Sequence, residues 1–165
     1  MNASILEPEQ LITGNGWLLA NYRQVHCAYV GPELDDEAYH AHLDQLAADI
    51  QARSTRHKIG VLYYAPETKN MDASRRRALA KVLEDHKEQL AQSTAAYALA
   101  TNSTFVRGVL STVFWLAPPP YPYKVVATPE QGIQFIGEHL MFLDRRALLE
   151  SFLAQLDHHG LAQAS

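Results

Sequence analysis

Apolar residues follow two different periods between residues 58 and 140. Short runs rich in β-branched and aromatic residues, at residues 59–65, 95–100 and 125–127, predict strands. In the segments between and after them, apolar residues recur every three or four positions, which predicts helices. Strands that alternate with helices are typical of an α/β fold, in which each helix carries the chain across a parallel sheet.

The N-terminal third of the chain predicts an antiparallel edge for this sheet. Residues 17–20 and 25–30 have the composition of two short strands, and the four residues between them suit a tight hairpin. A helix then begins at Asp35 or Asp36 and runs to about Arg53, with its apolar residues on one face. The chain therefore predicts a mixed sheet of about five strands, an antiparallel N-terminal edge followed by parallel β–α units, with helices packed on it.

Capping residues mark the starts of three further helices. They are Asp72 or Ser74, Ser103, and Thr128, which Pro129 follows. The first of these helices is expected to continue to about residue 90, because its apolar stripe does.

The domain organisation follows from these elements. We expect residues 1–16 to form a lead-in, residues 17–143 a single α/β domain, and residues 144–165 an extra C-terminal helix and tail. With 165 residues the chain is long enough to bury a core without a disulfide or a structural metal. The one cysteine, Cys27, excludes an internal disulfide and fits a reducing, cytoplasmic compartment.

Charge and hydropathy narrow the classes of function. The net charge of −4 disfavours a nucleic-acid binder, because attraction to phosphates requires a basic surface. No apolar run approaches the roughly 20 residues that span a bilayer. The N-terminus lacks the basic and apolar regions of a signal peptide. We therefore expect a soluble protein without a membrane span.

The sequence contains no motif typical of catalysis, cofactor binding or metal binding. Its eight histidines do not follow a zinc or iron spacing, and His40 and His42 are two apart on a helix, so they point in different directions. Glycine-rich nucleotide loops and nucleophile turns are also absent from the sequence. We predict no enzyme activity, no cofactor and no metal, although a site assembled from histidines and carboxylates in three dimensions stays open.

The order of the elements, together with three segments, resembles a known family. The segments are residues 75–83, which read RRRALAKVL, residues 98–116, and residues 122–128, which read PYKVVAT. They are similar to the STAS domains of anti-sigma-factor antagonists, especially the STAS-like (SpoIIAA-like) proteins abundant in myxobacterial genomes. The resemblance covers roughly residues 17–140 and implies a STAS-like fold with a regulatory role.

The resemblance also implies a phosphorylation site. Antagonist-type STAS domains carry a serine or threonine at a helix start, and Ser74, within Met71-Asp72-Ala73-Ser74, stands at the equivalent position. Arg75 replaces the glycine of that motif. A phosphate on Ser74 would add about −1.5 to −2 charges near the positive end of the helix. A simple helix cap explains Asp72 and Ser74 fully, and it is the preferred interpretation.

Two groups of residues are candidates for binding a protein partner. Aromatic and proline residues end one helix and fill the loop after it, as in many interface anchors, and a basic run begins at residue 75. The candidates are Phe114, Trp115, Pro119, Tyr121, Tyr123, Arg75 and Arg76. Alternatively, the loop packs back on the first hairpin and buries Trp115 against Trp17 or Tyr22, and the arginines form a solvated helix face.

These observations favour a non-enzymatic regulatory or scaffold module that binds a protein partner. The resemblance to STAS domains implies bacterial signalling with a phospho-switch at Ser74 as the finer role. A second copy of the chain is an alternative partner. The second hypothesis is a small-molecule or lipid-binding protein, with its ligand between the last helix and the sheet. The third is an enzyme with a spatially assembled site.

Overall fold

A single mixed β-sheet of six strands forms the centre of the molecule. The computed structural model describes residues 5–67, 72–116 and 118–161. Within them the strands lie in the sheet in the same order as in the chain. They are β1 (Gln10–Gly14), β2 (Trp17–Asn21), β3 (Val25–Val30), β4 (Ile59–Tyr64), β5 (Thr94–Ala100) and β6 (Tyr123–Val126). The first three strands are antiparallel, and β3 to β6 are parallel.

The prediction of an α/β fold with a mixed sheet is confirmed, but the strand count is six rather than about five. The additional strand is β1, which lies within the segment expected to be a lead-in. It pairs with β2 through a turn at Gly16, where φ is 82°. Most of its side chains are exposed at the sheet edge, so no apolar alternation marks the strand in the sequence.

Six helices accompany the sheet in the described residues. They are α1 (Asp36–Ala52), α2 (Ala73–Asp85), α3 (Lys87–Ser93), α4 (Thr104–Leu116), α5 (Pro129–Gly137) and α6 (Arg145–His158). The helix expected to run to about residue 90 is two helices, because the backbone leaves helical geometry at His86. The His86 ring donates from Nδ1 to the carbonyl of Val82 at 2.7 Å and so supports the break.

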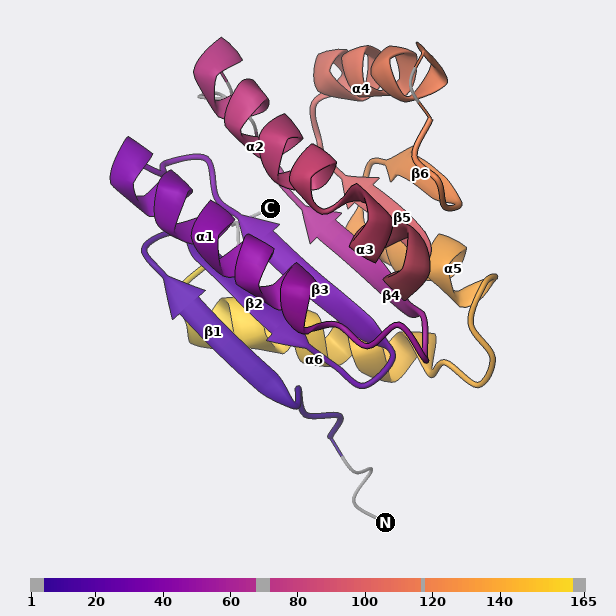
Figure 1. Cartoon of the computed structure of the whole chain (residues 1–165). Helices are drawn as coiled ribbons and strands as arrows, with labels where there is room; N and C mark the ends of the chain where they lie inside the picture. The colour runs from indigo at the N-terminus through magenta and orange to yellow at the C-terminus, as the bar shows by residue number, and fades with distance from the viewer. Residues whose placement is uncertain (1–4, 68–71, 117, 162–165) are drawn as a thin grey trace.

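The helices form a layer on each face of the sheet (Figure 1). Sequential parallel strands are joined by right-handed crossovers, which carry every connecting helix to the same face. Accordingly α1, α2 and α3 lie on one face, and α5 and α6 lie on the other. The helix α4, which joins β5 to β6, lies at the β6 edge of the sheet in Figure 1, and its Leu110 packs against the core on the α1 face.

Two separate cores result from this arrangement, one on each face. On β2, Leu18 contributes to the core beneath α5 and α6, whereas Trp17 and Leu19 contribute to the core beneath α1. The helix α5 approaches the sheet closely at Gly132, where a Cβ atom would lie 2.6 Å from Leu62 Cδ1. A larger residue there would force the Leu62 side chain to move.

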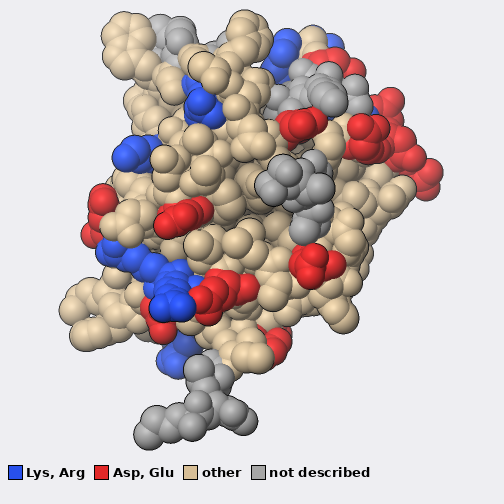
Figure 2. All heavy atoms as spheres, turned by 180° about the vertical axis from the view of Figure 1, so that it is seen from behind, with Lys and Arg blue, Asp and Glu red and all other residues tan. Residues whose placement is uncertain are grey.

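The exposed surface carries charges of both signs. On the face that bears α5 and α6, acidic and basic side chains are interspersed among uncharged ones (Figure 2). Among the described residues no helix is both long and apolar enough to cross a membrane.

His42 is a buried polar residue of the α1 face, and it predicts a pH dependence of stability. Burial lowers the pKa of the His42 ring from 6.5 to about 4. The unfolded chain therefore takes up a proton near pH 6.5, and the folded protein does so only near pH 4. The free energy of unfolding is expected to fall by about 3 kcal/mol between pH 7 and pH 4 from this group.

Urea unfolding at a series of pH values measures this loss. The matched control is His42→Gln, which can keep a hydrogen bond to the Tyr63 hydroxyl, 2.9 Å from His42 Nε2, but does not titrate. Stability of this variant is expected to vary less over the same range. An equal pH dependence in both proteins contradicts the assignment.

Candidate functional site at the α4 and β6 edge of the sheet

The helix α4 begins where β5 ends, and side chains fix its start. The Ser103 hydroxyl accepts from the backbone N–H of Val106 at 3.2 Å, as the sequence predicted for a cap. Arg107 donates from Nη1 to the carbonyl of Thr101 at 2.8 Å and from Nη2 to the Thr104 hydroxyl at 3.2 Å. The first turn of α4 is thereby held to the end of β5.

The outer side of α4 exposes two large aromatic side chains. Phe105 and Trp115 are each 78% exposed. The inner side of α4 contacts β6. The Phe114 ring packs against the Tyr123 ring, with 5.0 Å between the ring centroids. The Tyr123 hydroxyl also donates to the Phe114 carbonyl at 3.0 Å. The helix is thus attached at its C-terminal end, while aromatic surface faces solvent.

The alternative in which Trp115 is buried against the first hairpin is wrong. The hairpin residues have other partners: Trp17 packs against the His42 ring, and the Tyr22 hydroxyl lies 2.8 Å from the Ser151 hydroxyl. The sheet order explains this, because β2 and β6 lie near opposite edges with three strands between them. A loop that leads into β6 cannot reach the hairpin.

The five aromatic and proline candidates do not form one patch. Trp115 points to solvent, and Phe114 and Tyr123 contact each other. Tyr121 is partly buried and packs against Tyr97, with ring centroids 6.1 Å apart. Pro119 is partly buried. Trp115 is therefore the member of this group that is best placed to contact a partner.

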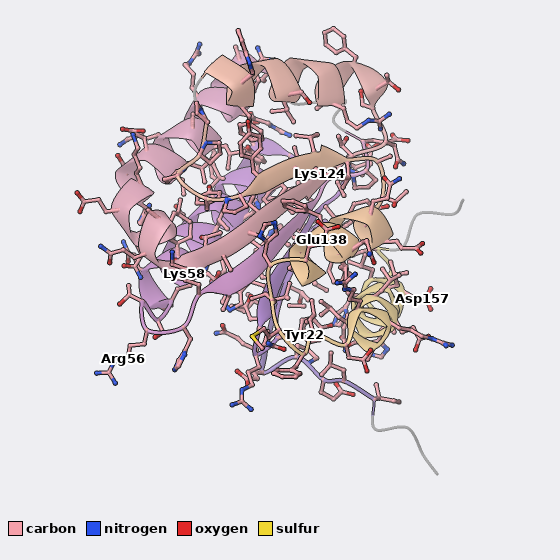
Figure 3. The ribbon with its side chains drawn as sticks, turned by 90° about the vertical axis from the view of Figure 1, so that its right-hand side faces the viewer. Tyr22, Arg56, Lys58, Lys124, Glu138 and Asp157 are labelled. Carbon is pink, nitrogen blue, oxygen red and sulfur yellow. The ribbon has the colours of Figure 1, made fainter. Side chains whose placement is uncertain are left out.

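A groove runs along β6, and Figure 3 labels two of the residues that line it, Lys124 and Glu138. It has a volume of about 390 Å³ and is lined from α4 by Arg107, from β6 by Lys124 and Val125, and from α5 by Phe135 and Glu138, among others. The Lys124 ammonium lies 6.0 Å from the centre of the Phe135 ring. Two cationic groups and one carboxylate therefore line a groove on a chain whose net charge is −4.

The backbone of β6 leaves hydrogen-bonding groups open to this edge. The carbonyl of Pro122 accepts from Tyr97 of β5 at 2.9 Å, and that of Val126 accepts from Thr101, the residue after β5, at 3.0 Å. In a parallel ladder alternate residues face the same neighbour, so the N–H and C=O groups of Tyr123 and Val125 face away from β5. Within the described residues β6 pairs with β5 alone.

The start of α2 holds the other candidates. Asp72 caps the helix by accepting from the Arg75 N–H at 2.8 Å, so Ser74 is free of the capping role and is exposed in the first turn. Met71 of the same motif lies outside the described residues. The carboxyl ends of β4 and β5 lead to the starts of α2 and α4, which therefore lie at the same end of the sheet (Figure 1).

Arg75 is held within the chain. Its guanidinium donates to the Asp36 carboxylate at 3.0 Å and to the Leu34 carbonyl at 2.7 Å, and it lies 5.1 Å from the centre of the Tyr39 ring. It therefore links α2 to α1, which is a structural role that the sequence did not indicate. Arg76 is exposed.

A buried polar cluster on the α1 face was missed from the sequence. The Asp49 carboxylate accepts from the Asn21 amide, from His26 Nδ1 at 3.1 Å and from Arg53 Nη2 at 3.0 Å. Burial alone would raise the pKa of Asp49, but His26 and then Arg53 outweigh it and hold that pKa below its ordinary value. The spacing of Asp49 and Arg53 on a helix is the one signal that could have indicated the pair.

Histidines and carboxylates do not converge on a metal site in the part of the chain that is described, since no group of three or more such side chains has suitable geometry there.

The fold is similar to that of a solved structure, an uncharacterized protein from the DUF3478 family with a SpoIIAA-like fold from Shewanella loihica PV-4. The TM-score is 0.52 and the sequence identity 12%, and the likeness covers 76% of this chain and 98% of the other. The chain therefore has a SpoIIAA-like fold, as its resemblance to STAS-like proteins implied. No family model matches the chain, and no curated protein does.

Proposed function

We propose that this protein is a non-enzymatic regulatory or scaffold module that binds another protein at the α4–β6 surface, defined as Phe105, Trp115 and the outer edge of β6. The observation that carries the proposal is the exposure of two large aromatic side chains beside an unpaired strand edge. Exposed aromatic residues are typical anchors of protein interfaces. Unpaired strand edges accept extended segments by backbone hydrogen bonding.

The occupant that fits this surface is an extended, acidic segment of a partner protein. Its backbone would pair with the outward N–H and C=O groups of Tyr123 and Val125. Its acidic side chains would meet Arg107 and Lys124, which line the groove beside the strand. Trp115 would then pack on the partner outside the groove.

Phosphorylation of Ser74 would regulate this binding in bacterial signalling. Ser74 is exposed in the first turn of α2, at the same end of the sheet as the start of α4. A phosphate there would lie near the positive end of the helix dipole and would add negative charge next to the exposed Arg76. An acidic partner would be repelled by this added charge.

Trp115→Ala is expected to weaken partner binding by roughly 30-fold, the effect of losing about 2 kcal/mol at an interface anchor. The measurement is affinity purification of the tagged full-length protein from its native cell, read by quantitative mass spectrometry, followed by titration of the enriched protein. Phe142→Ala is the matched control, because Phe142 is 92% exposed and lies between α5 and α6.

Val125→Pro tests the strand edge separately. It removes an N–H that faces away from β5, so the ladder to β5 keeps its bonds. Binding is expected to fall in this variant as well. If the enriched protein binds both variants as tightly as the wild type, the α4–β6 surface is not the binding site. If light scattering shows a dimer that Trp115→Ala dissociates, the partner is a second copy of the chain.

A small-molecule-binding function is the second candidate. The ligand was expected between the last helix and the sheet, but Leu148 and Phe152 of α6 are fully buried against the sheet there. A cavity with unpaired polar groups lies on the opposite face.

A further inference from the structure

A small cavity lies between α1, α3 and the sheet, on the face opposite α5 and α6. Its volume is about 30 Å³, room for one or two water molecules. Apolar side chains form most of its wall, among them Leu46, Ile50, Leu79 and Leu90. Several polar groups interrupt this wall, and their hydrogen bonding is incomplete.

Arg53 is the charged group of the cavity. It is 8% exposed, and one of its guanidinium nitrogens, Nη2, donates to Asp49 at 3.0 Å. Its Nε–H is buried and has no hydrogen-bond partner. The position of Arg53 is fixed, because it ends α1 and its carbonyl accepts from Gln89 of α3 at 2.7 Å. A buried guanidinium N–H therefore faces the cavity region unpaired.

Three hydroxyl groups lie around the same cavity, those of Thr94, Tyr97 and Tyr121. Thr94 is 2% exposed, and its hydroxyl has no partner. Tyr97 and Tyr121 line the same cavity, and their hydroxyls interact electrostatically with Arg53. Neither tyrosine hydroxyl makes a hydrogen bond to another group in the described part of the chain. Four groups that can donate a hydrogen bond thus lie around one small space.

Buried polar groups are normally hydrogen-bonded, and a cluster of exceptions requires an explanation. Asp49 also lines the cavity, but its oxygens already accept from Asn21, His26 and Arg53. The groups left to meet a ligand are the Arg53 Nε–H, which only donates, and three hydroxyls, each of which can donate. A carboxylate accepts hydrogen bonds and donates none, and it suits a guanidinium.

We propose that this cavity binds a small monocarboxylate, whose oxygens accept hydrogen bonds from Arg53 Nε and from the hydroxyls of Thr94, Tyr97 and Tyr121. The apolar end of the ligand lies against Leu79 and Leu90. The size of the cavity limits the ligand to a few non-hydrogen atoms, as in acetate. This site lies on the α1 face and is independent of the α4–β6 surface, so its test does not depend on the proposed function.

Titration of the full-length protein with sodium acetate, followed by NMR chemical shifts, tests the proposal. Sodium chloride at equal ionic strength serves as the reference. Saturable shifts are expected at residues around the cavity, with a dissociation constant on the order of 0.1–10 mM for so small a ligand. Thr94→Val and Tyr121→Phe each remove one donor and preserve side-chain shape, and each is expected to weaken acetate binding at least tenfold.

Both variants are expected to fold, because neither hydroxyl has a partner within the described protein. Tyr64→Phe, which removes a phenol hydroxyl outside the cavity, is the matched control and is expected to bind acetate like the wild type. The proposal is overturned if acetate gives no saturable shift, which would mean that the cavity holds water alone. It is also overturned if Thr94→Val and Tyr121→Phe leave the affinity unchanged, or if acetamide binds as tightly as acetate.

Discussion

Asp49→Ala is expected to lower the free energy of unfolding by about 3–5 kcal/mol, the usual cost of removing one partner from a buried ion pair. Asp49 is buried and accepts from the Asn21 amide, the His26 ring and the Arg53 guanidinium. Without the carboxylate, the charge on Arg53 stays buried with no counter-charge beside it. Urea unfolding of the two proteins at pH 7 measures the difference.

Asp85→Ala is the matched control for this prediction. Asp85 also pairs with a cation four residues away on a helix, Lys81 at 2.7 Å, but both side chains are exposed. Exposed pairs of this kind contribute about 0.3–0.5 kcal/mol, so this variant is expected to change little. Similar losses in the two variants would contradict the view that burial gives the Asp49 pair its importance.

The contribution of the Asp49 carboxylate to the free energy of unfolding is expected to fall in acid. The folded-state pKa of Asp49 lies below its ordinary value of 3.8. Its contribution to stability is therefore complete above about pH 4 and is lost as the pH falls through the folded-state pKa. The difference between wild type and Asp49→Ala should accordingly be constant from pH 7 to pH 5 and shrink in stronger acid.

Phe152→Ala is expected to lower the free energy of unfolding by about 3–5 kcal/mol, the range for removing a buried aromatic ring from a core. Phe152 is fully buried in the core beneath α5 and α6, together with Leu148 and Leu156 of the same helix. The neighbouring Ser151 hydroxyl lies 2.8 Å from the Tyr22 hydroxyl at the end of β2. The C-terminal helix is thus joined to the first hairpin by packing and by a hydrogen bond.

Urea unfolding again provides the measurement, with Leu153→Ala as the control. Leu153 is the next residue on α6 but is 42% exposed. Leu153→Ala should therefore lower the free energy of unfolding by less than half as much as Phe152→Ala. If Phe152→Ala is as stable as Leu153→Ala, α6 is dispensable for the fold. If the predicted loss is found, α6 is an integral part of the core and closes one face of the sheet.

Prediction from the sequence succeeded where a residue's role depends on its near neighbours in the chain. The strands of the parallel half lie where the apolar runs are, and the caps Ser103 and Thr128 act within three residues of their own positions. The expected C-terminal helix is present as α6, and its buried apolar side chains, Leu148, Phe152 and Leu156, recur at helical spacing. Helical and strand periods are local properties, so a single sequence carries them.

Prediction was incomplete where a role depends on contacts between distant segments. β1 has little apolar pattern, and its place is set by pairing with β2. The five aromatic and proline candidates form a run in the sequence, yet Trp115 faces solvent while Tyr121 packs inward against Tyr97. Arg75 belongs to a basic run, but residues of α1 and the loop before it hold its guanidinium.

The sequence by itself determined the mixed α/β class, the apolar faces of the helices and the order of the elements other than β1 and the break between α2 and α3. It did so because period, capping and turn chemistry act over a few residues. Only the tertiary structure decided which surfaces are open and which polar groups are buried. The cluster around Asp49 joins residues from β2, β3 and α1, and the donors around the cavity come from the end of α1, from β5 and from the loop before β6. Burial and hydrogen-bond satisfaction depend on everything packed around a group, and these neighbours are distant in the chain.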